Sequence, residues 1–176
     1  MGQILEARSI QVMTGTRVAG VEPQALRLVG QQLEARLTVW LTGAVGDPLF
    51  RESGLAVDKR GIMLVDDGLR SVTDQQVFGA GDCVTLAKYP HTPKAGVYAV
   101  RQGPVLWESL RAATRGSKPP RYQPQVGFLS ILNTCYGKAM LHYKGILAHK
   151  RWPFSLKDWI DRRFMEKYKR LVPNSS

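Results

Sequence analysis

Hydrophobic and polar residues alternate over two stretches near the start of the chain. Residues 4–13 and 16–21 show this period of two, which predicts strands. A hairpin is predicted next, with 25–29 and 33–41 as its arms, and the second arm ends in the apolar run TVWL. The glycine-rich stretch that follows contains Pro48 and predicts a break in regular structure. We expect the chain to cross between domains there.

Short apolar runs and one long helical pattern come next. Residues 61–66 and 76–79 predict two short strands. A helix is predicted to begin at Pro93, a residue favoured in a first turn, with Pro104 as a kink or break. Residues 116–120 hold two prolines and predict a linker to a C-terminal module.

The C-terminal module has the pattern of a small sheet followed by a helix. Residues 128–132 and 138–143 predict a β-hairpin around Tyr136-Gly137, and residues 143–149 predict a third strand. The final segment predicts an amphipathic helix with Ser155 as its N-cap. Its apolar stripe consists of Leu156, Trp159, Ile160, Phe164 and Tyr168, and the basic residues around it are Arg162, Arg163, Lys167, Lys169 and Arg170.

The segment QVFGAGDC at 76–83 contains Gly-x-Gly-Asp directly after a predicted strand. Glycines let a backbone approach a ligand closely, and a carboxylate accepts hydrogen bonds from sugar-like hydroxyls. We therefore predict that Asp82 contacts a ligand through hydroxyl groups, since a carboxylate repels phosphates. The free N–H groups at the start of the next helix would face the same ligand. Alone, this short motif is weak.

Several further segments give the motif a context. In their order and spacing, four segments resemble the C-terminal half of an FAD-dependent pyridine nucleotide oxidoreductase: VWLTGA at 39–44, SGLAVDKRG at 53–61, QVFGAGDC at 76–83 and the segment 92–103. Three more closely resemble the NADH dehydrogenase-like flavoprotein region fused to selenide, water dikinase: PKAGVYAVRQGPVL at 93–106, FLSIL at 128–132 and KDWIDRRFM at 157–165.

The resemblance implies an α/β fold, α+β in part. The implied fold is an incomplete FAD/NAD(P)-binding Rossmann-like fold with a C-terminal β-hairpin plus helix module. The resemblance assigns residues 1–44 to the closing strands of a nicotinamide-nucleotide-binding domain. It assigns 45–115 to the C-terminal part of the FAD-binding domain and 116–176 to an interface module. The sequence lacks the family's βαβ unit with Gly-x-Gly-x-x-Gly. We therefore expect a fragment, a truncated product or one half of a split enzyme, with a second chain supplying the N-terminal half.

The resemblance also implies FAD as cofactor and NADH or NADPH as substrate. In the family, the aspartate of the motif binds the ribityl chain of FAD, which implicates Asp82. The next helix points its N-terminus at the flavin ring, where its positive end stabilises the anion that develops on reduction. The predicted cofactor-binding residues are Gly79, Gly81, Asp82, Lys94, Ala95 and Gly96. No catalytic residue is assigned.

Cys83 and Cys135 form no Cys-x-x-Cys pair, so their spacing indicates neither a zinc ribbon nor a dithiol centre. We expect two reduced, partly buried thiols. Without paired cysteines, direct transfer from flavin to an external acceptor is favoured over disulfide reduction, and nothing favours sulfide:quinone oxidation. His91, His142 and His149 lack metal-ligand spacing, so no metal site is predicted, and only His91 lies near the loop as a weak candidate for proton transfer.

The net charge is +11, and residues 121–176 hold eleven Lys or Arg against three Asp or Glu. Such an excess suits lipid headgroups or nucleic acid, and the absence of a nucleic-acid motif disfavours the latter. Residues 150–171 predict either a peripheral membrane contact, with Trp159 at headgroup depth, or packing on the protein itself. Packing is favoured, because an amphipathic helix most often covers a core. A homo-oligomer is a further hypothesis for the partner.

Two interpretations of different class remain. The first is a partial oxidoreductase that passes electrons from NADH through flavin to a quinone-like acceptor and needs an N-terminal half. The alternative is a non-catalytic remnant or interaction module that binds a membrane surface or a partner flavoprotein chain. No run approaches the ~20 apolar residues of a membrane-spanning helix, and the first residues lack the signal-peptide pattern. We expect a cytoplasmic location, or a peripheral one on the cytoplasmic face of a membrane.

Overall fold

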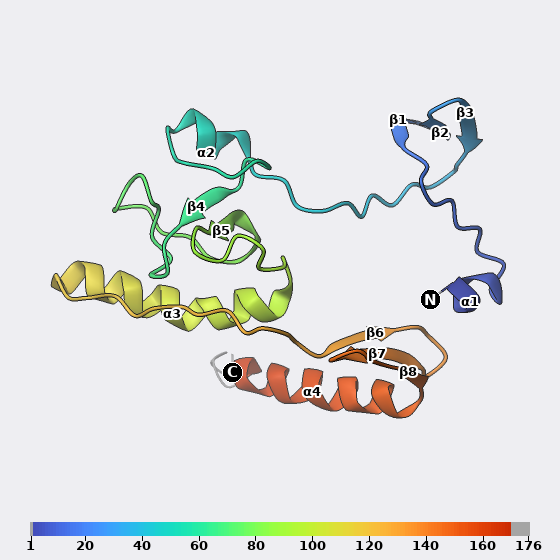
Figure 1. Ribbon diagram of the computed structural model, residues 1–176. Coiled ribbons are helices and arrows are strands. Elements are labelled where there is room, and N and C mark those ends of the chain that lie inside the picture. Colours follow the sequence, from blue (N-terminus) through green and yellow to red (C-terminus); the bar gives the residue numbers. More distant parts are fainter. Residues whose placement is uncertain (1, 170–176) are drawn as a thin grey trace, which may run out of the picture. The chain divides into compact units, whose positions relative to one another are not determined.

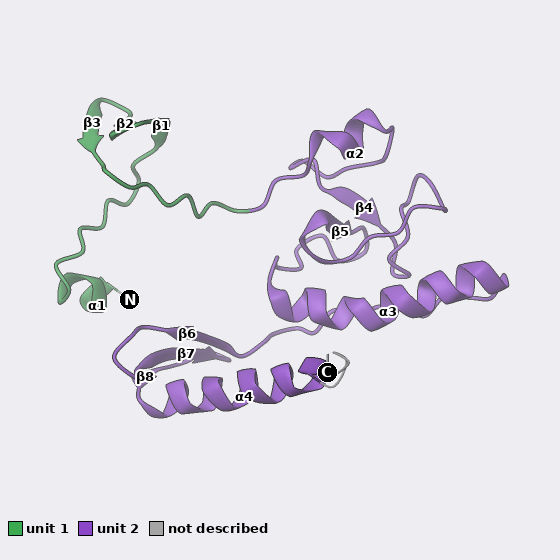
Figure 2. Cartoon of the chain, turned by 180° about the vertical axis from the view of Figure 1, so that it is seen from behind, with its two compact units in different colours: residues 1–43 green, residues 44–176 purple. Residues whose placement is uncertain are grey.

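The computed structural model describes residues 2–169. The chain divides into two compact units, 1–43 and 44–176, drawn in different colours in Figure 2. The domain boundaries expected after residues 44 and 115 stay predictions.

The first unit is a short helix followed by a three-stranded antiparallel meander (Figure 1). Its elements are α1 (Gly2–Glu6), β1 (Val18–Glu22), β2 (Ala25–Leu28) and β3 (Gln31–Glu34). The predicted hairpin is confirmed, because β2 pairs with β3 with Leu26 opposite Leu33. Of the described residues in this unit only Leu28 is buried.

Two strand predictions in this unit are wrong. Residues 4–13 form the end of α1 and an irregular segment, because the N–H of Ile10 turns back to the carbonyl of Leu5 at 2.9 Å. The run TVWL at 38–41 forms no strand, and Leu41 is 88% exposed. β-propensity alone does not make a strand when no neighbouring strand supplies hydrogen bonds.

The second unit begins with elements grouped around a two-stranded parallel sheet. They are α2 (Pro48–Glu52), β4 (Met63–Val65), the 3-10 turn η1 (Gly81–Cys83), β5 (Val84–Leu86) and α3 (Gly96–Arg115). Strands β4 and β5 pair with Met63 opposite Val84. The core cluster around them consists of Met63, Val65, Leu69, Val84, Leu86 and Tyr122.

Pro48 starts a helix instead of breaking regular structure, which corrects the prediction for this stretch. The carboxylate of Asp47 caps α2 by accepting from the N–H of Leu49 at 2.9 Å. Proline fits the first helical position, because an N–H there would have no intrahelical partner.

Strand predictions around the Gly-x-Gly-Asp motif need a further correction. Residues 61–66 contain β4, as predicted, but residues 76–79 contribute only one isolated bridge, between Phe78 and Arg70. The regular strand is β5, which follows the motif instead of preceding it.

Helix α3 begins at Gly96, so Pro93 precedes it and does not lie in its first turn. Pro104 lies inside the helix, which continues without a break to Arg115. Gly116 ends it in the left-handed region at φ 64°, where glycine carries no Cβ penalty, and its N–H turns back to the carbonyl of Ala112.

The C-terminal part of this unit is a three-stranded antiparallel sheet with a helix packed on it (Figure 1). Its elements are β6 (Ser130–Asn133), β7 (Ala139–Tyr143), β8 (Ile146–Lys150) and α4 (Trp152–Lys169). The predicted three strands and final helix are confirmed. Ser155 lies within α4 and is not its N-cap, and the predicted basic residue Arg170 lies outside the described residues.

The sheet covers only the beginning of α4. Pro153 is buried and Leu156 half-buried, whereas every residue from 158 to 169 is exposed. Trp159 and Tyr168 are 56% and 46% exposed. The expectation that the apolar stripe packs on the protein itself therefore holds at Leu156 but is wrong for the later positions.

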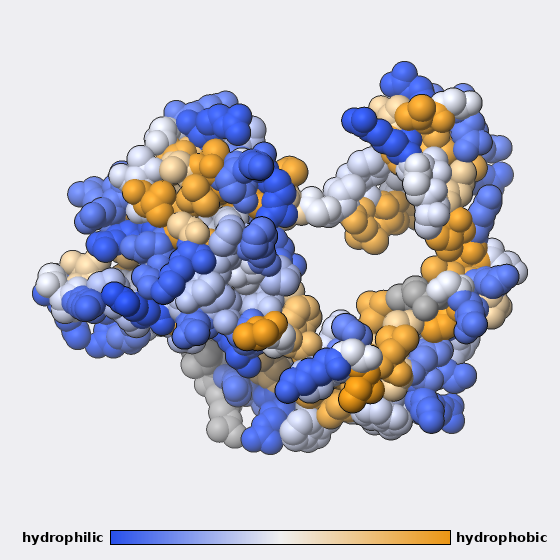
Figure 3. All heavy atoms as spheres, viewed as in Figure 1, coloured by the Kyte–Doolittle hydropathy of each residue, from blue (hydrophilic) through white to orange (hydrophobic). Residues whose placement is uncertain are grey.

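Hydrophobic residues remain at the surface of this sheet. Figure 3 shows them over the strands β6–β8, beside hydrophilic residues. Leu132, Ile146 and Leu147 are 51%, 65% and 62% exposed. None of the helices in residues 2–169 combines the length and the apolar character required to cross a lipid bilayer.

Candidate cofactor site

Two glycines shape the loop that holds the Gly-x-Gly-Asp motif. A Cβ on Gly79 would lie 2.5 Å from Cγ1 of Val84 and 2.6 Å from Cε of Met63, so the backbone reaches the core only because the side chain is absent. Gly81 has φ +81°, in the left-handed region that other L-residues rarely adopt. Packing and backbone conformation therefore both require glycine in this loop.

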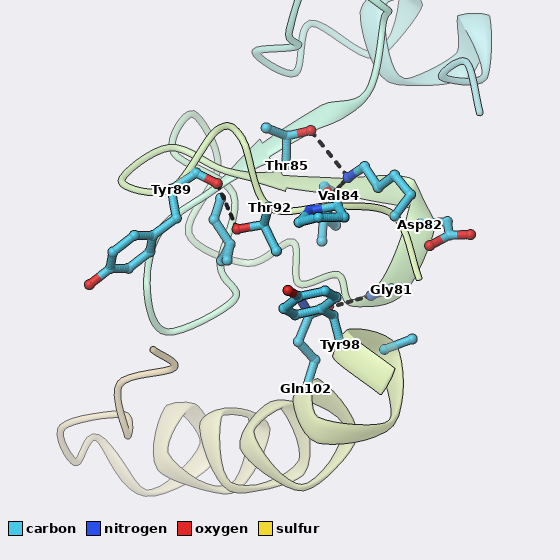
Figure 4. A pocket seen from close by; sticks show the side chains of 12 residues that line it. Gly81, Asp82, Val84, Thr85, Tyr89, Thr92, Tyr98 and Gln102 are labelled. Carbon is cyan, nitrogen blue, oxygen red and sulfur yellow. Dashed lines mark hydrogen bonds between the residues drawn. The ribbon is translucent and has the colours of Figure 1, made fainter. Parts of the chain in front are cut away.

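A buried side chain of α3 fixes the same loop. The N–H of Gly81 donates to Oε1 of Gln102 at 2.6 Å, and Gln102 is 4% exposed (Figure 4). This hydrogen bond ties the turn η1 to the first turns of α3. The loop and the helix start are thus held together, and their sharing of one ligand site stays a prediction.

Asp82 is the second residue of η1 and is exposed. Its side chain points away from the other lining side chains in Figure 4. An exposed carboxylate on a fixed turn can accept hydrogen bonds from a ligand's hydroxyl groups without breaking contacts within the chain.

The start of α3 presents its backbone without side-chain cover. Ala95 is the N-cap residue, at φ −145° and ψ 144°, and has no side chain that could accept from the first N–H groups. Apart from its chain neighbours and the backbone of its own helix, a Cβ on Gly96 would have no atom of residues 2–169 within 4 Å. The positive end of the helix is therefore open to a ligand with a carbonyl or anionic edge.

The side chain of Lys94 is bonded within the fold and is not that of a solvated surface lysine. Its Nζ donates to the carbonyl oxygen of Val84 and to Oγ1 of Thr85, the latter at 3.3 Å (Figure 4). Burial lowers the pKa of Lys94 below its ordinary value of 10.5, with the Arg60 guanidinium acting in the same direction and Asp58 against it.

The network continues from Thr85 to Asp58. The Thr85 hydroxyl donates to Oδ2 of Asp58 at 2.9 Å, while Oδ1 accepts from the N–H groups of Arg60 at 2.8 Å and Ile62 at 3.1 Å. Burial raises the pKa of Asp58, but these hydrogen bonds and the Arg60 charge outweigh it, so the pKa lies below 3.8. The carboxylate is thus held ionised near Lys94.

Three of the six predicted residues line one small pocket: Gly81, Asp82 and Lys94. Gly79 packs into the core beneath the loop, and Ala95 and Gly96 form the helix start beside Lys94. The other residues lining the pocket are Val84, Thr85, Leu86, Tyr89, Thr92, Pro93, Tyr98, Ala99 and Gln102. Sequence reasoning missed these, although Gln102 falls at a helical spacing from Tyr98 that could have indicated a shared face.

A larger, mainly apolar groove adjoins this pocket and shares Tyr89, Thr92, Pro93 and Tyr98 with it. Tyr98 donates to the carbonyl of Gln125 at 3.4 Å and meets the ring of Phe128 edge-on, with centroids 5.7 Å apart. The remaining lining residues are Lys88, Pro90, His91, Gln123–Phe128, Ser130 and His142–Gly145. Within the described chain, Oε1 of Gln125 is buried without a hydrogen-bond partner.

The two cysteines differ from expectation, because both are exposed free thiols instead of partly buried ones. Cys83 follows Asp82, and its Sγ contacts the carbonyl of Ala80 at 3.1 Å. In the described residues no three His, Cys, Asp or Glu side chains group as a metal site. His91 is exposed at the rim of the apolar groove.

The donor set fits the groups that the resemblance assigns to FAD. Asp82 offers a carboxylate to sugar-like hydroxyls on a turn that Gln102 fixes. The bare start of α3 at Gly96 suits a ring edge that takes up negative charge.

The fold is Rossmann-like, as in FAD/NAD(P)-binding oxidoreductases, and comparison with known proteins agrees. The sequence profile of the family named pyridine nucleotide-disulphide oxidoreductase matches residues 1–103. The chain belongs to this family, whose members use FAD and a pyridine nucleotide.

Two curated relatives are named NADH dehydrogenase-like proteins. The chain is 35% identical over 81 residues to the NADH dehydrogenase-like protein Rv1812c of Mycobacterium tuberculosis, covering 46% of this chain and 20% of that protein. The matching protein from strain CDC 1551 / Oshkosh, NADH dehydrogenase-like protein MT1860, gives the same values. The chain thus matches about one fifth of the length of these curated relatives. The likeness to the region fused to selenide, water dikinase stays a prediction.

Solved structures show the same fold. The sulfide:quinone oxidoreductase of Aquifex aeolicus superposes with a TM-score of 0.72 at 17% identity, covering 98% of this chain and 46% of that one. The NAD-dependent persulfide reductase of A. fulgidus gives a TM-score of 0.59 at 23% identity, covering 79% and 26%.

Proposed function

We propose that this chain forms the ribityl and ring-side part of the FAD site in an oxidoreductase that takes electrons from NADH or NADPH and passes them to a quinone-like acceptor. The observation that carries the proposal is the junction of η1 and α3. There, the hydrogen bond from Gly81 to Gln102 holds an exposed carboxylate next to an uncapped helix start. The remainder of the site would come from residues outside this sequence, in the same polypeptide or a second chain.

Each residue of the junction has a separate task in this proposal. Asp82 binds hydroxyls of the ribityl chain, and the N–H groups at Gly96 orient the ring edge and stabilise negative charge there. Lys94 holds its own segment against β5 and so positions the helix start. Bound FAD would supply the hydride acceptance and the onward electron transfer.

The apolar groove next to the pocket supports an acceptor with a flat apolar ring. Its aromatic residues Tyr89, Tyr98 and Phe128 offer surfaces on which such a ring can stack. The two cysteines, exposed and 52 positions apart, give no pair for a disulfide substrate.

Flavin binding tests the proposal. The chain is purified alone and after co-expression with a polypeptide that carries Gly-x-Gly-x-x-Gly, and bound FAD is measured by visible absorbance and titration. Asp82→Ala should weaken FAD binding about tenfold or more, the range for hydrogen bonds to a charged group. Glu52→Ala removes an exposed carboxylate of α2 and should leave binding unchanged. Colourless protein in both preparations, or equal binding by Asp82→Ala, would contradict the proposal.

A further inference from the structure

The apolar groove beside the candidate cofactor site is lined by basic side chains from two separate segments. Lys88 and His91 come from the segment between β5 and α3, and His142 and Lys144 from the end of β7 and the turn after it. No Asp or Glu is among the described residues that line the groove. Its volume is about 880 Å³, within the range of small-molecule sites. The lining therefore suits a small anion with an apolar body.

The two lysines of the groove are not neutralised by the fold. Within residues 2–169, no ion pair includes Lys88 or Lys144. Nζ of Lys88 lies 5.5 Å from the centroid of the Tyr89 ring, and Nζ of Lys144 lies 5.5 Å from that of Tyr143. Both tyrosines line the groove as well. Each ammonium thus lies beside an aromatic ring, with its charge available to a ligand.

Lys144 occupies a backbone position that disfavours lysine. Tyr143 pairs with Ile146, so Lys144 and Gly145 form a two-residue turn between β7 and β8. Their φ angles are +47° and +82°. Two positive angles are those of a type I′ turn, in which Asn-Gly is a preferred pair. Asparagine at 144 would suit the turn better, and a residue held in an unfavourable conformation points to a role outside the fold.

We propose that the groove binds an aromatic carboxylate, whose anionic group meets Lys88 and Lys144 while its flat ring stacks on Tyr98 and Phe128. Ammonium groups form charge-assisted hydrogen bonds with carboxylates, and aromatic side chains favour a planar ring. The inference rests on the proposed function in one respect. If the groove holds the electron acceptor, that acceptor is a quinone-like ring with an anionic substituent.

Charge and shape together favour this occupant over two simpler ones. A neutral aromatic ring would stack on Tyr98 and Phe128 but leave Lys88 and Lys144 without a counter-charge. An aliphatic carboxylate would supply the counter-charge but not the flat surface that aromatic rings favour. Only a ring that carries the charge uses both features of the lining.

Isothermal titration of the full chain without flavin tests the proposal, with 2-naphthoate as the probe. The neutral amide 2-naphthamide has the same ring and should bind at least about tenfold more weakly. Cyclohexanecarboxylate has the charge without the flat ring and should bind several-fold more weakly. Lys88→Gln and Lys144→Gln should each weaken 2-naphthoate binding roughly fivefold and leave 2-naphthamide binding unchanged.

Lys144→Asn separates ligand binding from folding. Asparagine removes the charge but adopts positive φ more readily than lysine. The variant should raise the midpoint of chemical denaturation and still lose as much affinity for 2-naphthoate as Lys144→Gln. If Lys144 served only the turn, stability would rise with no loss of affinity. The control Lys59→Gln/Lys118→Gln removes two charges from other exposed positions and should keep wild-type affinity.

Three results would overturn the proposal. They are equal affinity for 2-naphthoate and 2-naphthamide, binding of cyclohexanecarboxylate as tight as that of 2-naphthoate, and an equal loss of affinity in the control variant. The titration contains no FAD, so it fails independently of the proposed function. A chain that binds FAD through Asp82 but does not bind 2-naphthoate would refute the carboxylate site alone.

Discussion

Lys94 and Thr85 join two segments of the candidate site, since Nζ of Lys94 lies 3.3 Å from Oγ1 of Thr85. Thr85 in turn donates to Asp58 at 2.9 Å. A chain of polar contacts therefore runs from the approach to α3, across β5, to the loop before β4.

The first prediction concerns the pH dependence caused by Lys94. Burial lowers its pKa, so between the lowered value and 10.5 the unfolded chain binds more protons than the folded one. The stability contributed by this residue must then rise with pH through that window. The difference in unfolding free energy between wild type and Lys94→Met should increase from neutral pH to about 10.5. A difference that is constant with pH would contradict the lowered pKa.

Asp58→Asn tests the other end of the network. The folded pKa lies below 3.8, so the stabilisation is present above 3.8 and is lost as pH falls through the folded value. We expect the variant to lose about 1–3 kcal/mol at neutral pH, with the difference shrinking below 3.8 in acid unfolding curves. Asp74→Asn is the control, because Asp74 is exposed and should change stability by less than about 1 kcal/mol.

Gly79→Ala should destabilise the fold by about 1–3 kcal/mol, because its Cβ would overlap Val84 and Met63. Gly96→Ala adds the same methyl group at a position where no described atom lies within 4 Å, apart from the chain neighbours and the backbone of the same helix. That variant should change stability by less than about 1 kcal/mol in chemical denaturation. Similar losses in both variants would show that the tight packing under Gly79 is not what requires glycine.

Gln102→Leu should loosen the loop of the Gly-x-Gly-Asp motif. The substitution removes the acceptor of the Gly81 N–H and leaves that donor unsatisfied, at a cost of about 1–3 kcal/mol. Hydrogen exchange at the Gly81 amide should accelerate. Gln123→Leu, at an exposed position, should leave the Gly81 amide as protected as in wild type.

Much of the fold could be predicted because it rests on local signals. The β6–β8 sheet follows from alternating strands around Tyr136-Gly137 and Gly145, and these turns adopt positive φ at Gly137 (67°) and Gly145 (82°). The loop of Gly79 and Gly81 could be found for the same reason, since glycine marks the backbone positions that other residues resist.

The rest depends on tertiary contacts that a sequence pattern does not contain. Strand β5 has only three residues, all buried, so it shows neither alternation nor length. The sequence places Lys94 at the flavin-side helix start, but its pattern does not contain the Val84 carbonyl and Thr85 hydroxyl that make this lysine an internal donor. The exposure of Trp159 depends on where the sheet ends, which helical periodicity does not specify.

The outer edge of β5 is closed by its own chain, which limits how another polypeptide could join this fold. The N–H of Val84 donates to the carbonyl of Gly81, the carbonyl of Val84 accepts from Lys94, and the carbonyl of Leu86 accepts from the N–H of Tyr89 at 3.0 Å. An added strand would have to displace these bonds to hydrogen bond there. A complementing subunit would therefore have to replace these bonds before it could extend the sheet at this edge of β5.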